Sequence, residues 1–265
     1  MRVGREHDGG YVVSRRTITG ASGIVGLGIN DDWSFEQHCV AINPTAEITG
    51  IDGSVSATTF RRNGLTASMK AAYAAARLRA ATAAEELRRA RHWFRTASAF
   101  QAFFARPGHR FIQSYFGAVG GEGVVDWQQV KATFTRRDRE PAAPHLFVKM
   151  DIEGEEYRTL PGILEDADSI TGLVIEFHDC DLLWERFTEI MDQAARDFAV
   201  VHVHGNNCVP LVPGTPCPSA IEVSLANRSL LPAELHPSGA SYPLDGLDMP
   251  NLAARPDYPL VFDDE

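Results

Sequence analysis

The segment of residues 146–156 (LFVKMDIEGEE) constrains the fold most, because an apolar run stops abruptly at a group of carboxylates. The run itself predicts a strand buried on both faces, which is typical of parallel sheets covered by helices. Ligands of such sheets bind beyond the carboxyl ends of the strands. We therefore expect Asp151 and Glu153 at the functional edge of an α/β fold. Glu155 and Glu156 fit the acidic first turn of the next helix.

Composition sets the class of protein. The chain has 265 residues with 44% hydrophobic content, enough for one large core, so we expect a single domain over residues 1–265. No run reaches the roughly 18 apolar residues of a membrane span, and the N-terminus lacks the apolar core of a signal peptide. These features predict a cytoplasmic protein. The four cysteines form no CxxC pair, which indicates neither a zinc knuckle nor a disulfide framework.

The net charge of −10 conceals a strongly basic segment. Residues 61–110 contain ten arginines and one lysine against two glutamates, a charge of +9, so the remainder carries −19. Residues 65–106 are rich in Ala and Arg, contain no proline and lie between Gly64 and Pro107, which predicts one or two long helices. We interpret residues 54–110 as a basic helical insert or lid within the domain.

The second half of this insert is amphipathic. Trp93, Ala97, Phe100 and Phe104 follow helical spacing, and arginines lie on the opposite side. A helix whose aromatic face packs on the body is the simplest interpretation. Peripheral membrane contact through residues 88–106, an anionic partner or a homodimer would also use such a face, and no nucleic acid is expected.

The rest of the chain alternates strands and helices. This alternation predicts right-handed crossovers and a doubly wound, mostly parallel seven-stranded sheet, with the proline-rich stretches 210–218 and 232–259 as loops. The predicted strands are residues 23–29, 47–51, 111–119, 146–151, 173–178, 198–204 and 220–225.

Two motifs point to a cofactor side of the sheet. Gly26 and Gly28 lie at a strand-to-helix turn where the backbone must approach a ligand closely. The motif is not GxGxxG, which favours a cofactor without phosphates. Asp52 closes the next strand, where related folds use a carboxylate to bind ribose hydroxyls, although an Asp in a DGS turn is equally typical of a loop.

Two histidines point to a reacting side. His178 and His204 each end a strand at the same edge as Asp151. Such a set predicts a general base, a metal site made of Asp151, His178 and His204, or hydrogen-bonded structural groups. The residues alone leave these three interpretations open.

Several motifs in order resemble one enzyme family. DGGYVV, GINDDWSFE, KMDIEGEE, VIEFH, HVHGNN and the late IEV together resemble the FkbM-type S-adenosylmethionine-dependent methyltransferases, in particular the branch with an HxHGNN signature. The resemblance implies a class I methyltransferase (Rossmann-like) fold with the cofactor over the first two strand ends. It does not cover the basic insert.

The resemblance also implies roles for particular residues. Gly26 and Gly28 match the cofactor loop, Asp52 the ribose-binding acid, and Asp151 the residue beside the transferred methyl group. The first strand lacks the usual acidic residue before its first glycine. The acidic groups that would instead meet the cofactor ammonium are Asp8, Asp31, Asp32 and Glu36.

The function implied is O-methylation of a hydroxyl on a sugar, glycan or natural product, with His178 or His204 as base. A divalent ion at Asp151 would serve the same end by lowering the pKa of the hydroxyl. The arginines of the insert suggest an anionic acceptor. Two other classes stay open: a metal-dependent hydrolase using the same Asp and His residues, and a non-catalytic module recruited by its basic helix.

Overall fold

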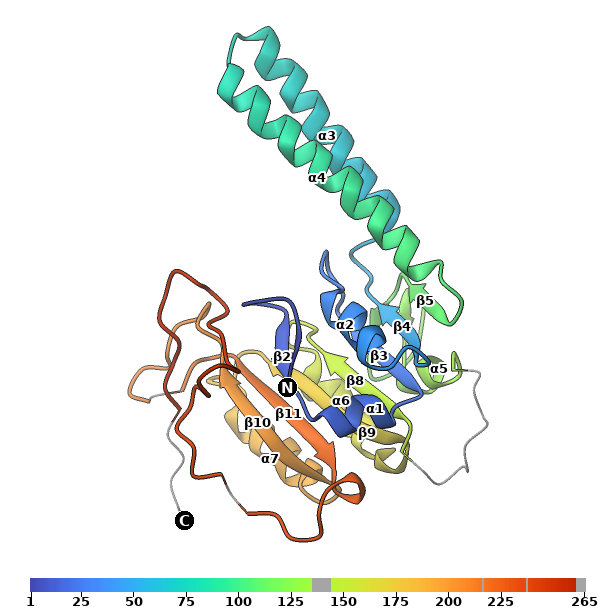
Figure 1. Ribbon diagram of the computed structural model, residues 1–265, viewed down its shortest axis with the longest axis vertical. Helices are drawn as coiled ribbons and strands as arrows, with labels where there is room; N and C mark the ends of the chain where they lie inside the picture. The colour runs from blue at the N-terminus through green and yellow to red at the C-terminus, as the bar shows by residue number, and fades with distance from the viewer. Residues whose placement is uncertain (135–143, 216, 237, 261–265) are drawn as a thin grey trace.

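The computed structural model of the protein describes residues 1–134, 144–215, 217–236 and 238–260. Parts of the predicted 1–265 domain and of its two proline-rich stretches therefore lie outside the described residues. Within them, a seven-stranded sheet forms the centre of the molecule (Figure 1). Its strand order is β10-β11-β9-β8-β3-β4-β5.

All neighbours in this sheet are parallel except those of β11, which is antiparallel to both β9 and β10. The predicted doubly wound, mostly parallel seven-stranded sheet is thus confirmed. The strands are β3 (Gly23–Leu27), β4 (Glu47–Ile51), β5 (His109–Ile112), β8 (Leu146–Met150), β9 (Ile170–Phe177), β10 (Phe198–Gly205) and β11 (Ile221–Asn227). The strand predicted over residues 111–119 is shorter than expected, because the chain leaves the sheet after Ile112 to form β6 (Tyr115–Phe116), which pairs with β7 (Val124–Val125).

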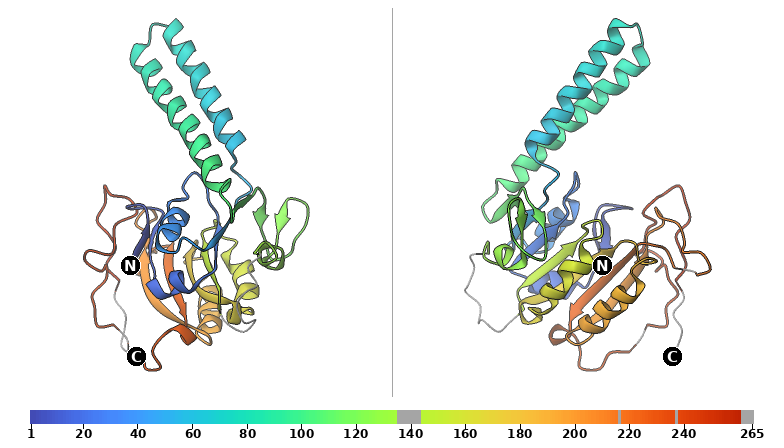
Figure 2. Two further views of the ribbon diagram at one scale, coloured as in Figure 1. Left: turned by 45° about the vertical axis from the view of Figure 1, so that its right-hand side comes forward. Right: turned by 180° about the vertical axis from the view of Figure 1, so that it is seen from behind.

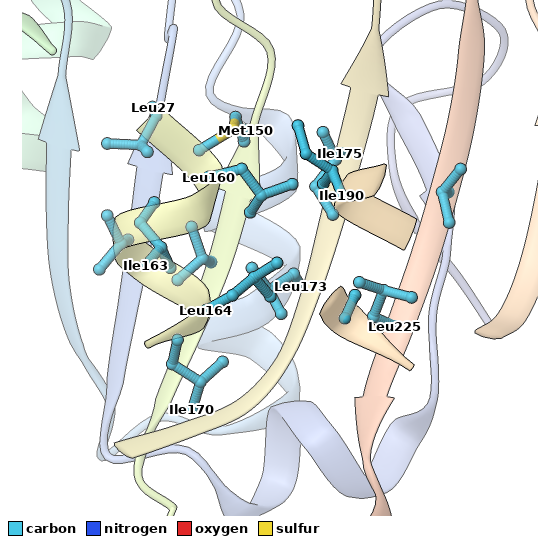
Figure 3. Close-up of a cluster of buried hydrophobic side chains, with 14 of the residues drawn as sticks. Leu27, Met150, Leu160, Ile163, Leu164, Ile170, Leu173, Ile175, Ile190 and Leu225 are labelled. Atoms are coloured by element: carbon cyan, nitrogen blue, oxygen red, sulfur yellow. The ribbon is translucent and has the colours of Figure 1, made fainter. Parts of the chain in front are cut away.

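Helices cover both faces of the sheet. On one face lie α5 (Trp127–Lys131), α6 (Glu156–Leu164) and α7 (Trp184–Ala194), with the short 3-10 helix η1 (Ala167–Ser169) before β9. A second 3-10 helix, η2 (Arg228–Leu230), follows β11. Figure 3 shows Leu160 and Ile163 of α6 packed on the β-strands, both fully buried. Full burial of each such side chain contributes about 1.5–3 kcal/mol.

The other face carries α1 (Arg15–Gly20), α2 (Ser34–Ile42) and the N-terminal hairpin of β1 (Arg2–Gly4) and β2 (Gly10–Val12). Phe35 of α2 stacks on Phe147 of β8, with ring centroids 5.9 Å apart. Tyr11 of β2 is buried against Phe35. The N-terminal hairpin thus brings the DGGY motif over the carboxyl half of the sheet.

The basic insert forms an antiparallel helical hairpin, α3 (Ala57–Ala76) and α4 (Ala80–Phe104), which projects away from the sheet (Figures 1 and 2). The expectation that Gly64 marks a helix boundary is wrong. Gly64 lies buried inside α3, where a Cβ atom would come within 3.0 Å of the Phe94 ring. Close helix packing explains this glycine. Among the described residues, no helix combines the length and apolar character needed to cross a bilayer.

Candidate functional site

The first part of the site is the turn after β3, where Gly28 contacts the ends of the two neighbouring strands, β4 and β8. Gly28 has a positive φ of 76°, and a Cβ atom there would lie 1.7 Å from the Asp151 carbonyl oxygen. Its N–H donates to the Ile51 carbonyl at 3.0 Å, and the Asp151 N–H donates to Leu27 at 3.1 Å. Only glycine fits here, so the ends of β3, β4 and β8 are held together at one point.

Glu36 of α2 lies directly beneath this turn. A Cβ atom on Gly26 would come within 2.2 Å of Glu36 Oε1, so the carboxylate takes up the space that a side chain at position 26 would need. Glu36 is buried, and among the described residues Oε1 has no hydrogen-bond partner. Burial raises the pKa of Glu36 to about 7. A buried carboxyl group of the following helix thus lies beside the first strand.

Lys149 places a buried ammonium in the same region. Its Nζ donates to the Gly28 carbonyl at 2.7 Å and lies 3.5 Å from Asp151 Oδ2. Burial disfavours this charge, but the carboxylates of Asp151, Glu36 and Glu176 outweigh it and raise the pKa of Lys149. The electrostatic environment therefore stabilises an ammonium group at the end of β3.

Tyr11 links the end of β8 to the end of β9. Its hydroxyl has a single proton to donate, and two carboxylate oxygens lie within reach of it, Asp151 Oδ2 at 3.3 Å and Glu176 Oε2 at 3.4 Å. Burial, followed by the charges of these carboxylates, raises the pKa of Tyr11 well above its usual value. Glu176 Oε1 accepts from Asn206 Nδ2 at 2.6 Å, and burial and Asp151 raise the pKa of Glu176. Tyr11 is therefore a fixed donor between the two acids.

His178 follows β9 and faces several carboxylates. Its Nδ1–H donates to Glu156 Oε1 at 3.1 Å, which leaves Nε2 directed toward Asp151 Oδ1 at 3.9 Å and Glu153 Oε2 at 3.6 Å. Burial opposes a charged ring, but the hydrogen bond and charge of Glu156, with the charges of Glu176 and Asp151, raise the pKa of His178 to about 9. The bond to Glu156 fixes the tautomer and the ring orientation.

Glu156 does more than begin a helix. It is fully buried, and its carboxylate also accepts from the N–H groups of Ile152 at 3.0 Å and Gly154 at 2.9 Å. These bonds shape the turn that carries Glu153, whose φ is 56°. Interpretation of Glu156 as a helix-start residue is therefore incomplete.

Asp151, Glu153 and His178 have ligand atoms that all lie within 4.8 Å of one another. A carboxylate bound to the far nitrogen of the histidine, as Glu156 is, also occurs behind histidine ligands of metals. The three residues are thus able to hold a divalent cation. They differ from the predicted set of Asp151, His178 and His204.

His204 lies in a separate polar cluster. Its Nδ1 bonds Glu222 Oε2 at 3.3 Å and its Nε2 bonds Asp257 Oδ2 at 2.9 Å. Burial opposes the charge, but these two hydrogen bonds raise the pKa of His204 to about 10. Both nitrogens are occupied, so this conformation favours a structural imidazolium over a base. His178 and His204 share an edge of the sheet but are separated by the intervening strand β11.

Asp52 is already saturated with hydrogen bonds. Oδ2 accepts from the N–H groups of Ile29 at 3.1 Å and Asn30 at 2.8 Å, and Oδ1 accepts from the N–H of Ser54 at 2.7 Å and its hydroxyl at 2.6 Å. A carboxylate offers about four acceptor positions, so none is left for ribose hydroxyls in this conformation. Asp52 shapes the loop after Gly28.

The remaining predicted acids lie toward solvent. Asp8 is exposed and pairs with Arg5 at 3.3 Å, and Arg5 also contacts Asp32 at 3.1 Å. Asp32 accepts from the N–H and hydroxyl of Ser34 at the start of α2. Asp31 is exposed. Of the predicted acids, Glu36 is the one placed against Gly26.

Sequence reasoning gave no functional role to Tyr11 or Lys149, and it interpreted Glu156 only as a helix-start residue. Tyr11 is a single aromatic residue in a short N-terminal strand, and its distance from Asp151 along the chain hides the contact. Lys149 carried a signal, because a charged residue inside a doubly buried strand needs a partner. The partners of Lys149 are the Gly28 carbonyl and the Asp151 carboxylate.

Comparisons with known proteins add similarities of fold. No protein-family model and no curated protein matches the sequence. Among solved structures, the chain is similar to precorrin-6y C5,15-methyltransferase from Geobacter metallireducens GS-15, with a TM-score of 0.37 and 8% identity over 80% of this chain and 83% of that one. It is also similar to the O-methyltransferase NcsB1 from neocarzinostatin biosynthesis, solved with S-adenosylmethionine, with a TM-score of 0.31 and 8% identity over 81% of this chain. The matched part spans about half (51%) of NcsB1. At these values no residue role or substrate is transferred to this chain.

Proposed function

We propose that the protein is an S-adenosylmethionine-dependent methyltransferase that methylates a hydroxyl group, as the FkbM-type resemblance of its motifs suggests. The observation that supports this most is the buried Glu36 carboxylate oxygen, which has no hydrogen-bond partner among the described residues and lies against Gly26. An uncompensated buried acceptor is costly, and a bound ligand is one way to satisfy it.

The residues fit the charged end of this cofactor. Glu36 would accept from its ammonium, and the Gly28 carbonyl, which already accepts from an ammonium, offers a second acceptor. Asp151 lies beside the turn and would face the sulfonium. Asp52 would keep the loop in shape rather than bind the ribose.

When bound, the cofactor supplies an activated methyl group and a good leaving group, so the protein must mainly align the acceptor and remove one proton. His178 would take that proton on Nε2, since Nδ1 donates to Glu156. In the free protein its raised pKa keeps the ring protonated near pH 7. A positive charge beside Asp151, whether the cofactor sulfonium or a divalent ion, would lower the pKa of His178 toward a value suited to a base.

The acceptor is proposed to be a hydroxyl of a sugar, glycan or other natural product. An aliphatic hydroxyl needs its proton removed as the new bond forms, and this need matches a histidine at the edge of the sheet.

The cofactor assignment is tested by calorimetric titration with S-adenosylhomocysteine. Glu36→Gln should weaken binding at least about tenfold, because a charge-assisted hydrogen bond is worth roughly 1.5–3 kcal/mol. Glu47→Gln is the matched control, since Glu47 is a buried glutamate at the start of β4, at the amino ends of the strands and away from the site. Equal affinities for the two variants would refute the role of Glu36.

A second candidate is a metal-dependent hydrolase, favoured by the cluster of Asp151, Glu153 and His178. Its three ligand atoms are of the imidazole and carboxylate type that binds divalent transition metals. Titration with Mn²⁺ or Zn²⁺, and of S-adenosylhomocysteine with and without chelator, separates the candidates. Tight metal binding with no affinity for S-adenosylhomocysteine favours the hydrolase, and cofactor binding that a chelator leaves unchanged favours the methyltransferase without metal.

A further inference from the structure

The part of the α3–α4 hairpin between residues 65 and 89, its distal half, is not covered by the sheet. Its base is anchored by aromatic contacts, with Phe60 and Phe100 packed on one another and Phe100 on Trp33 and Phe111. Farther out the two helices contact each other through Gly64, Ala67 and other small residues, and between residues 75 and 89 no side chain is buried. Figures 1 and 2 show this half standing free of the body. The predicted aromatic face of residues 88–106 is thus mostly used for packing.

The distal half presents apolar side chains to solvent. Leu65, Met69 and Tyr73 are 58%, 66% and 61% exposed, and Leu78 at the turn is 93% exposed. The first three recur every four residues, so they form one stripe on α3. That stripe is opposite the buried seam. An exposed apolar patch at the end of a projection is typical of a binding surface.

Basic residues accompany this stripe. Residues 57–104 contain nine Arg and Lys residues against two glutamates, a charge of +7, so the remainder of the chain carries −17. Both glutamates lie within 3.8 Å of Arg89 on α4. Arg77 lies over the Tyr73 ring, 5.2 Å from its centroid, and Lys70 and Arg79 line one hollow with Tyr73, so positive charge lies beside the stripe.

We propose that the distal half of the hairpin docks on an anionic lipid membrane surface. Apolar side chains flanked by Lys and Arg match the boundary between headgroups and acyl chains, where long basic side chains reach the phosphates. A second hairpin is a poor partner, because two surfaces of charge +7 repel each other. The acidic body is no obstacle, since α3 is about 30 Å long and charge is screened over about 8 Å at physiological ionic strength.

Co-sedimentation of the full chain with vesicles tests this inference. The protein should bind phosphatidylcholine vesicles that contain phosphatidylglycerol, bind neutral vesicles much more weakly, and lose binding as salt rises. The apolar variant Leu65→Ser/Met69→Ser/Leu78→Ser and the charge variant Lys70→Gln/Arg77→Gln/Arg79→Gln should each weaken binding at least about tenfold. Leu182→Ser is the control, because Leu182 is an exposed leucine that precedes α7.

A second measurement gives a signal gained rather than lost. In the Leu78→Trp variant, the tryptophan emission maximum should shift to shorter wavelength with anionic vesicles and not with neutral ones. Absence of binding to anionic vesicles, equal binding by all variants, or a stable dimer in ultracentrifugation that the apolar variant dissociates would each overturn the proposal. Cofactor binding is measured separately, so failure of one proposal is distinguishable from failure of the other.

Discussion

Glu36 shows how one residue can be unfavourable for folding and useful for binding. Its carboxylate is buried beside Gly26, and among the described residues Oε1 accepts no hydrogen bond. Its pKa is raised from the ordinary value to about 7, so folding favours the protonated form and stability falls as pH rises from about 4.5 to 7.

Glu36→Gln should therefore stabilise the free protein above pH 7. The neutral amide avoids the cost of a buried carboxylate, and the gain in the free energy of unfolding should be about 1–3 kcal/mol at pH 8. Urea unfolding at pH 5 and pH 8 checks this, because the gain should be small at pH 5. A variant less stable than the wild type at pH 8 would contradict the account.

His178 should determine the pH dependence of turnover. His178→Gln is expected to lower kcat by about 10² to 10⁴ while affinity for S-adenosylhomocysteine is unchanged. In the wild type, the rate should rise with pH through an apparent pKa above 6.5, since the neighbouring carboxylates raise the pKa of His178. His109→Gln, on β5, is the control. A loss of cofactor affinity as large as the loss of rate would argue for a structural role.

His204 is expected to act on stability. Because its folded pKa is raised to about 10, its contribution is complete below its unfolded pKa of about 6.5 and is lost as pH rises toward 10. His204→Gln should cost about 3 kcal/mol at pH 6, as expected when one partner of a buried ion pair is removed. Urea unfolding at pH 6, 8 and 10 should show this difference shrinking. A difference that does not vary with pH would exclude the charged ring.

At the scale of elements, the turn after β3 holds the site together. Gly28 has a positive φ, and an added Cβ atom would meet the Asp151 carbonyl. Gly28→Ala should lower the free energy of unfolding by about 3 kcal/mol and weaken cofactor binding. Gly162→Ala in α6, with no atom near the added Cβ, should instead stabilise by about 1 kcal/mol. Similar values for both variants, from urea unfolding, would show that the turn is not constrained.

The strands were predictable because most of them are short, largely apolar runs bounded by turn residues. Their order in the sheet and the contacts across it were not predicted. β11 enters between β9 and β10 although it follows both in sequence, so His178 and His204 are two strand spacings apart, about 10 Å. Likewise, the Ala- and Arg-rich composition without proline predicted the helices of the hairpin, but it did not predict that Gly64 packs against Phe94 of the second helix.

The whole molecule separates two charged parts. The body carries a sheet edge with buried carboxylates, an ammonium and an imidazole, and the hairpin carries the positive charge away from it (Figure 1). This separation fits the two proposals, in which the hairpin binds an anionic membrane surface and the sheet edge binds the cofactor.

Shortening the hairpin should therefore leave the sheet edge intact. Replacement of residues 68–89 by a short Gly-Ser turn joins α3 to α4 at the buried Ala67 and Ala90. The shortened protein should keep its affinity for S-adenosylhomocysteine and lose its binding to anionic vesicles. Loss of cofactor affinity would instead identify the hairpin as a lid.

The central claim is that the end of β3 binds S-adenosylmethionine, and titration calorimetry of the full chain with S-adenosylhomocysteine at pH 8 tests it most directly. The account predicts saturable binding of one ligand per chain that is unchanged by chelator. The absence of heat and of any ligand-induced rise in Tm, at ligand concentrations up to about 1 mM, the upper end of typical KM values, would contradict it.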